Sequence, residues 1–193
     1  MKISKQLEIA IKSSNEAKLS LIRSEKKILN AINLITKKLK LKGKIFLCGN
    51  GGSAADAQHL AAEFLVRLDP KKNRSPIPAI SLAMDTSTIT ACSNDYGFEN
   101  IFLRNFKALF SKNDVLIAIT TSGRSPNILK VLKFAKKNKI LTVGFLGCNG
   151  GKVKKFCDIS LVVDSKIIPR IQEAHIFLGH YIFSQVEKKY FKN

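Results

Sequence analysis

The chain has 193 residues, which is enough for one domain with a sizeable core, and its 45% hydrophobic content excludes an intrinsically disordered protein. The formal net charge of +19 raises the question of nucleic acid, but the basic residues are mostly scattered lysines and arginine is scarce. We therefore expect no nucleic-acid partner, and a preference for anionic small molecules through electrostatic steering.

Nothing in the sequence indicates a membrane protein or an exported one. No stretch approaches the ~18 apolar residues of a membrane span, and the first residues lack the apolar run and cleavage site of a signal peptide. The four cysteines, Cys48, Cys92, Cys148 and Cys157, form neither a CxxC pair nor a zinc-finger pattern. We expect a cytoplasmic protein with reduced thiols and no membrane partner.

The first expected element is helical and covers about residues 4–41, either as two helices or as one kinked helix. Its apolar residues recur at helical spacing, and neither proline nor glycine interrupts it before Gly43. So long an amphipathic segment needs a partner surface, either on this domain or on another subunit. We expect one domain, with helices over 1–42 and an α/β core with a C-terminal helix over 43–193.

After Gly43 short apolar runs alternate with helical patterns. Strands are expected at 44–48, 79–83, 114–120, 140–146 and 158–164, and helices at 54–68, 86–94, 98–110, 126–138 and 169–190. Continuously apolar strands that alternate with helices predict a five-stranded parallel sheet covered on both faces. In such sheets the ligand side lies at the carboxyl ends of the strands.

Two strand-to-helix turns suit an anion. The first, CGNGGSAAD at 48–56, has glycines that allow close approach, and its Ser53 leads into a helix N-terminus. The second, TTSGRSPN at 120–127, gathers hydroxyls before a helix that Ser125 is expected to cap and Pro126 to open. Neither is a Walker A motif, and the first does not match GxGxxG. Ordinary turn chemistry is the alternative for each, but two such loops at one sheet edge favour a phosphate site.

His59 and Glu63 are four residues apart, so they share one face of the helix that follows the first loop. Their neighbours are mostly apolar, and burial there raises a carboxylate pKa toward that of a useful base. A pair of this kind also binds divalent metals. A solvated helix face or a structural hydrogen bond is the alternative.

The C-terminal helix carries Gln172 and the other two histidines, His175 and His180. The two histidines are five residues apart, about 140° around the helix, so they face different ways. Gln172 and His180 lie about 12 Å apart along the axis, so they bind one ion only if both side chains reach toward each other. A neighbouring subunit that supplied one of them would ease this, a hypothesis that rests on the spacing alone.

Together these pieces resemble the SIS (sugar isomerase) family, and within it the phosphoheptose isomerases. The matching stretches are CGNGGSAADAQHLAAE (48–63), SNDYGFENIF (93–102), TTSGRSPN (120–127) and RIQEAHIFLGH (170–180). The resemblance implies one SIS domain, a three-layer αβα sandwich with a five-stranded parallel sheet behind a long N-terminal helical segment. It implies a homotetramer that converts sedoheptulose 7-phosphate to D-glycero-D-manno-heptose 7-phosphate, a precursor of the heptose in lipopolysaccharide, capsule or another conjugate.

The resemblance also implies where the site lies. Metal ligands, with one zinc per subunit as the usual ion, map onto His59, Glu63, Gln172 and His180. Substrate contacts map onto Asn50, Gly51, Gly52, Ser53, Glu63, Asn94, Asp95, Thr120, Thr121, Ser122, Ser125 and Gln172. Two positions depart from the family pattern. Thr120 stands where serine is usual and keeps the hydroxyl, and Arg124 replaces a commoner asparagine and adds a cation beside the expected phosphate.

The implied reaction moves a proton between C1 and C2 of an open-chain sugar through an enediol, so it needs a base on the carbon and an acid or electrophile on the oxygens. We assign the base to Glu63 and the acid to His180, and we expect zinc to polarise the carbonyl. The same ion would lower the pKa of Glu63, which opposes its use as a base. The alternative is a non-catalytic SIS protein that binds a sugar phosphate or a replication-initiator partner. The presence of both Glu63 and His180 favours the enzyme.

Overall fold

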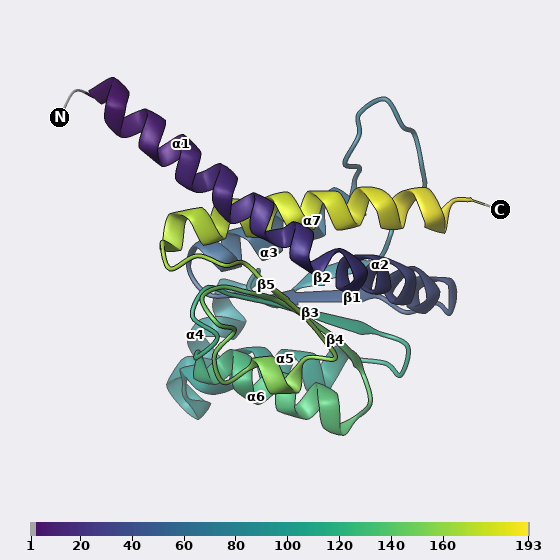
Figure 1. Ribbon diagram of the computed structural model, residues 1–193. Helices are drawn as coiled ribbons and strands as arrows, with labels where there is room; N and C mark the ends of the chain where they lie inside the picture. Colours follow the sequence, from purple (N-terminus) through teal and green to yellow (C-terminus); the bar gives the residue numbers. More distant parts are fainter. Residues whose placement is uncertain (1–2, 193) are drawn as a thin grey trace.

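A five-stranded sheet lies between two layers of helices in the computed structural model, which describes residues 3–192 (Figure 1). The strands are β1 (Ile45–Cys48), β2 (Ala79–Ser81), β3 (Val115–Thr120), β4 (Leu141–Leu146) and β5 (Ile159–Val162). They run in the order β2-β1-β3-β4-β5, and every neighbouring pair is parallel. This confirms the predicted parallel sheet covered on both faces.

One layer contains α1 (Ile3–Leu19), α2 (Glu25–Lys40), α3 (Gly52–Leu65) and α7 (Ile168–Tyr190), drawn above the sheet in Figure 1. The 3₁₀ turn η1 (Ser20–Ser24) separates α1 from α2, so the N-terminal segment is a bent pair of helices, as expected. Both α1 and α2 contact α7. The N-terminal helices therefore find a partner surface within their own chain.

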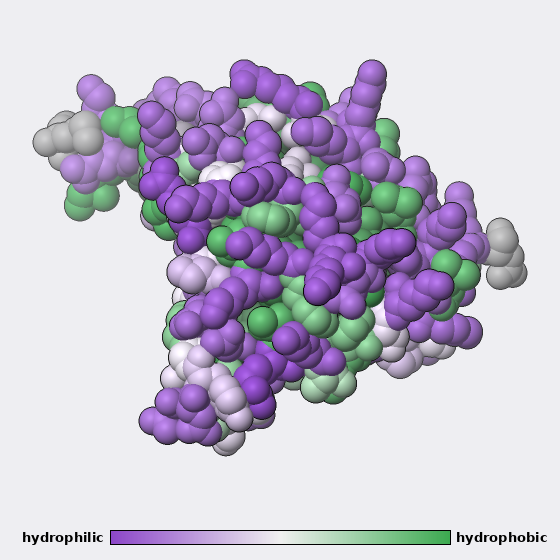
Figure 2. Space-filling view, turned by 90° about the horizontal axis from the view of Figure 1, so that it is seen from below, coloured by the Kyte–Doolittle hydropathy of each residue, from purple (hydrophilic) through white to green (hydrophobic). Residues whose placement is uncertain are grey.

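The other layer contains α4 (Thr86–Tyr96), α5 (Ile101–Leu109) and α6 (Pro126–Lys137), with the short 3₁₀ turns η2 (Phe98–Asn100) and η3 (Lys154–Phe156). Figure 2 looks at the molecule from this side and shows hydrophilic side chains over much of the face, with apolar patches between them. No helix within residues 3–192 is both long enough and apolar enough to span a membrane.

The strands divide their side chains between two hydrophobic cores. Ile45 and Leu47 of β1 point into the core under α2, α3 and α7, whereas Phe46 and Cys48 point into the core under α4, α5 and α6. Burial on both faces explains why these strands are continuously apolar in sequence. The first of these two cores lies under α3 and α7.

The strand order sets the position of the ligand side. From β1 the chain moves outward to β2, then crosses back to β3 on the other side of β1. Because β1 and β3 are direct neighbours, with Cys48 opposite Ala118, the loops after them leave the same sheet edge side by side. Open α/β sheets bind ligands at such a reversal of strand order. The expectation that the two anion loops share one edge is therefore met.

The main differences from the sequence prediction lie at element ends. The helix expected at 54–68 begins at Gly52 and ends at Leu65, because the backbone of Val66 leaves helical geometry at φ −103°, ψ −84°. The helix expected at 98–110 is divided into η2 and α5. The last strand is also shorter than expected, Ile159–Val162.

Candidate active site

Three side chains from two helices meet beside the sheet. His59 and Glu63 come from α3 and His180 comes from α7. The Nε2 atom of His59 is 2.9 Å from Nε2 of His180 and 3.1 Å from Oε1 of Glu63. One ligand atom from each residue lies within 4.8 Å of the others. A single chain thus gathers three of the four expected metal ligands, and no neighbouring subunit is needed to supply His180.

A close helix contact brings α7 to α3 at this point. A Cβ atom built on Gly179 would lie 2.5 Å from Cδ1 and 2.6 Å from Cδ2 of Leu60, and Leu60 is fully buried. Only glycine therefore allows the two helices to approach this closely. Leu60 follows His59 in sequence and Gly179 precedes His180, so the same contact brings the two imidazoles together.

The three side chains, which we call the triad, form a metal-binding donor set. Two nitrogens at 2.9 Å cannot both carry a proton between them, so at least one Nε2 is unprotonated and has its lone pair on this side. Burial lowers the pKa of His180, the charge of His59 lowers it further, and Glu63 acts in the opposite direction. Two imidazole nitrogens and a carboxylate oxygen are the protein ligands of many catalytic divalent-metal sites, so these residues fit such an ion.

Gln172, the fourth expected ligand, lies against the first anion loop. A Cβ atom built on Gly52 would be 2.5 Å from Nε2 of Gln172, so the glycine leaves room for the amide. This position suits the contact with substrate that the resemblance implies. Its role as a metal ligand stays a prediction.

Asp56 was not singled out from the sequence. It lies one turn before His59 on α3, and burial raises its pKa to about 6, with His59 acting in the opposite direction. Its Oδ2 atom is buried and has no hydrogen-bond partner among residues 3–192. A partly buried carboxyl group with a raised pKa therefore lies one helical turn from His59. The sequence signal was its spacing of three residues from His59.

The first loop turns sharply from β1 into α3. Gly51 has φ +56°, in the left-handed region that favours glycine. Ser53 is buried at the start of α3. The amide of Asn50 is paired in both directions with that of Asn127, at 2.9 and 2.8 Å. Asn127, which was not singled out from sequence, therefore joins the first loop to the second.

In the second loop the hydroxyls divide into two groups. Thr120 is buried and accepts a hydrogen bond from the Gly123 amide, and Ser122 accepts one from the Arg124 amide, so both shape the turn. Ser125 stands at the N-cap position before Pro126, as expected, but its side chain makes no capping bond. Its hydroxyl therefore remains free to bind a ligand.

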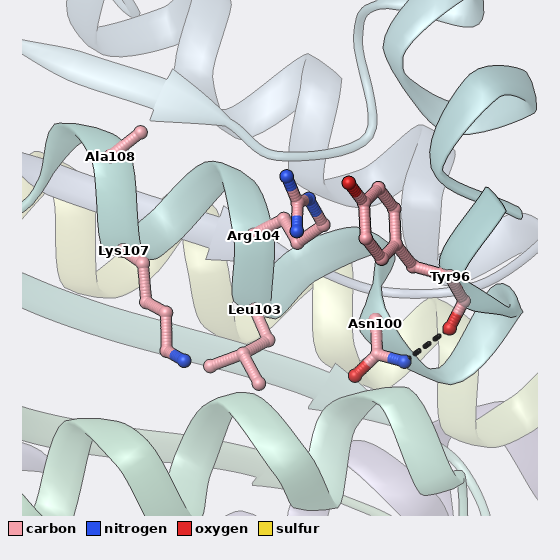
Figure 3. Close-up of a pocket in the computed structure, with 6 residues that line it drawn as sticks. All are labelled: Tyr96, Asn100, Leu103, Arg104, Lys107 and Ala108. Carbon is pink, nitrogen blue, oxygen red and sulfur yellow. Dashed lines mark hydrogen bonds between the residues drawn. The ribbon is translucent and has the colours of Figure 1, made fainter.

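Asn94 and Asp95 take no part in the contacts described above for the two loops and the triad. Both are exposed on α4, where the Asn94 amide donates to the Asp95 carboxylate at 2.8 Å. The next residue, Tyr96, lines a hollow of about 470 Å³ beside α5, where the Arg104 guanidinium lies 3.6 Å from the centre of its ring (Figure 3). No triad residue lines this hollow. The assignment of Asn94 and Asp95 to substrate binding stays a prediction.

Known proteins resemble this chain in sequence. A family model described as SIS domain matches residues 13–147. The phosphoheptose isomerase of Clostridium acetobutylicum is 45% identical over 188 residues, which cover 96% of this chain and 95% of that protein. The phosphoheptose isomerase of a Nitratiruptor species is 52% identical over 152 residues, 79% of this chain and 80% of that protein.

Solved structures show the same likeness in three dimensions. The phosphoheptose isomerase of Neisseria gonorrhoeae superposes with a TM-score of 0.89 at 34% identity, and the match covers 97% of this chain and 100% of that chain. The enzyme of the same name from Francisella tularensis gives a TM-score of 0.91 at 33% identity, with 97% and 100% covered.

Proposed function

The chain belongs to the SIS domain family, and from this premise we propose that it is an aldose–ketose isomerase that converts sedoheptulose 7-phosphate to D-glycero-D-manno-heptose 7-phosphate. The reaction is the first step toward the activated heptose of bacteria. The observation that carries the proposal is the triad of His59, Glu63 and His180. Its first two members lie on the helix that leads out of the first anion loop, and His180 reaches them from α7.

In this proposal the loops hold the phosphate. The hydroxyls of Ser53 and Ser125, the latter without a capping bond, would supply donors for its oxygens together with amide groups at the starts of α3 and α6. Thr120 and Ser122 keep the second loop in shape through their own hydrogen bonds. Binding at the phosphate orients the reacting carbons of the open-chain sugar. Gln172, which lies against Gly52, would contact the sugar between its phosphate and its reacting carbons.

Glu63 is the proposed base that takes the proton from one carbon and returns it to the other. A proton must also move between the two oxygens, and His180 is the proposed partner. Burial lowers the pKa of His180 and so favours its neutral form, which suits a role in donating and accepting hydrogen bonds better than one as a charged acid. This sharpens the role that the sequence assigned to it.

Zinc is the proposed ion, held by His59, Glu63 and His180, with Gln172 as the fourth ligand. The chemistry that bound zinc supplies is polarisation of the sugar carbonyl. Glu63 would then share its carboxylate between metal and proton transfer, and Asp56, with a pKa of about 6, is a second carboxyl available nearby.

A homotetramer in the cytoplasm, with sites completed by neighbouring subunits, is also part of the proposal. Exposed apolar side chains support an assembly: Leu19, Ile22, Leu29, Phe177 and Tyr181 line one groove between the N-terminal helices and α7. Light scattering coupled to size-exclusion chromatography measures the mass of the assembly. A monomer at micromolar concentration would contradict the proposed homotetramer.

The test is a discontinuous assay with sedoheptulose 7-phosphate, with and without added zinc. We expect turnover by the wild-type protein. No turnover by well-folded protein under either condition would contradict the isomerase. The non-catalytic alternative is not favoured, because the similar proteins are named as isomerases and both proposed acid–base residues are present.

A further inference from the structure

Arg74 lies in the segment between α3 and β2, a stretch expected to be only a polar loop, yet only 5% of its side chain is exposed. Its guanidinium contacts two helices. Nη2 donates to the backbone carbonyl of Glu63 at 2.8 Å and Nη1 to that of Phe64 at 2.8 Å. Nε donates to Oε2 of Glu187 on α7 at 2.7 Å. One side chain thus joins the end of α3 to α7.

These contacts are those a helix C-terminus needs. The last carbonyls of α3 have no partner inside the helix, and they form the negative end of its dipole. The guanidinium donates to two of them, the Glu63 carbonyl and the Phe64 carbonyl that also accepts from the Ile77 amide, and places its positive charge at that end. Because 6% of the Glu187 side chain is exposed, the ion pair is almost fully buried, and removal of either partner leaves a charge without compensation.

The contacts also concern the triad. The carbonyl that Nη2 holds belongs to Glu63, the residue whose carboxylate meets His59 at 3.1 Å. Glu187 lies seven residues after His180 on α7, so the Arg74–Glu187 pair also connects Arg74 to the helix that carries the third triad residue. Lysine cannot reproduce this arrangement, because one ammonium group cannot span two carbonyls and a carboxylate as a planar fork does.

We infer that Arg74 is a positioning residue for the isomerisation: it holds the backbone of Glu63 so that its carboxylate stays aligned with His59 and His180. Only the catalytic part of this inference, the effect on isomerisation, rests on the proposed function. Its geometric consequence, an ordered triad, is independent of the reaction and can be measured by zinc affinity.

Two variants separate positioning from stability. Arg74→Lys removes the fork to the two carbonyls, whereas Glu187→Gln keeps it and removes only the charge of the partner. Val131→Ala, which opens a cavity under α6 in the opposite core, is the control for loss of stability alone. Each is made in the full chain, and its melting temperature is measured with kcat, KM and zinc affinity, the last by competition with a chromophoric chelator.

For Arg74→Lys we expect zinc affinity and kcat each to fall about tenfold or more, with KM for the sugar phosphate within about twofold. Glu187→Gln and Val131→Ala should lower the melting temperature but keep zinc affinity and kcat within about threefold of wild type. The proposal is overturned if zinc affinity and kcat follow the melting temperature in all three variants, or if Arg74→Lys leaves both unchanged. If wild type shows no turnover, the proposed function fails, and the zinc measurement still decides the role of Arg74.

Discussion

The two anion loops and the triad lie on the same ligand side of the molecule but are built in opposite ways. The second loop is shaped by contacts within three residues, such as the bond from the Gly123 amide to Thr120. The triad joins residues 121 positions apart, through the 2.9 Å contact of His59 with His180. The turn within each loop is therefore set largely by neighbouring residues, although the Asn50–Asn127 pair links the two loops, whereas the triad depends on how two helices pack.

This difference separates two tasks in the proposed reaction. The loops bind the phosphate, which does not react, and the triad acts at the carbons and oxygens that do. Changes in the triad or in its helix contact should therefore affect turnover and metal affinity. Changes that act on the loops should affect substrate binding.

Glu63→Gln should have the largest effect. It removes the proposed base and leaves both loops intact, so we expect kcat to fall by about 10²–10⁴-fold with little change in KM. The discontinuous assay measures both constants, and circular dichroism checks the fold. Ser125→Ala is the contrasting variant, because its free hydroxyl belongs to the phosphate site; there KM should rise more than kcat falls. Unchanged turnover in Glu63→Gln would remove the base assignment and leave Asp56 as the next candidate.

Gly179→Ala should displace His180 from the other two triad residues, although Gly179 is not itself a member of the triad. The added Cβ would lie 2.5 Å from a methyl group of the buried Leu60, so α7 must move away from α3 and take His180 with it. We expect the free energy of unfolding to fall by about 1–3 kcal/mol. Zinc affinity should fall about tenfold, because His180 shifts relative to its partners.

The control is the double variant Leu60→Val with Gly179→Ala, in which the smaller side chain makes room for the new methyl group. Urea unfolding and chelator competition should show partial recovery of both stability and zinc affinity. Loss of stability with normal zinc affinity in Gly179→Ala would mean that the helix contact does not position His180.

The fold was largely predictable because its signals are local. Apolar runs such as residues 114–120 read as buried strands, and their alternation with helices predicts a parallel sheet. Element ends were less predictable, since the end of α3 depends on Val66 and on bonds from Arg74, which lies in the loop after the helix. A polar loop in sequence gave no sign of a buried arginine.

The candidate site was predictable in part for the same reason. The pairing of His59 with Glu63 follows from helical spacing alone. That His180 reaches them within one chain depends on Gly179 and Leu60, which have no distinctive pattern in sequence. Likewise, the Asn50–Asn127 pair joins residues 77 positions apart. Long-range contacts of this kind become visible only once the helices and loops are placed.

His175 offers a test through pH, because it is fully buried on the inner side of the helix that carries His180. Burial lowers its pKa from 6.5 to about 4. The unfolded chain therefore binds a proton here below about pH 6.5, while the folded chain does so only near pH 4. This contribution to stability is complete above about pH 6.5 and is lost as the pH falls toward 4.

We expect the free energy of unfolding to fall by about 2 kcal/mol from this group between about pH 7 and about pH 5. Urea unfolding at both pH values measures it. His175→Leu, which keeps an apolar group of similar size, should remove that part of the decline. An equal decline in the variant and in wild type would show that other groups cause it.

Asn127→Ala should have the smallest effect and should act on the loops rather than the triad. It removes both bonds to Asn50 and the bond that Asn127 Oδ1 accepts from the Ile128 amide, so stability should fall by about 1–2 kcal/mol. Because the two loops lose their link, KM for the sugar phosphate should rise several-fold, while zinc affinity stays unchanged. Asn138→Ala, at the opposite end of α6 with one exposed hydrogen bond to the Phe134 carbonyl, is the matched control and should change neither. If Asn127→Ala instead lowered zinc affinity with no change in KM, the loops and the triad would not be the separate structures proposed here.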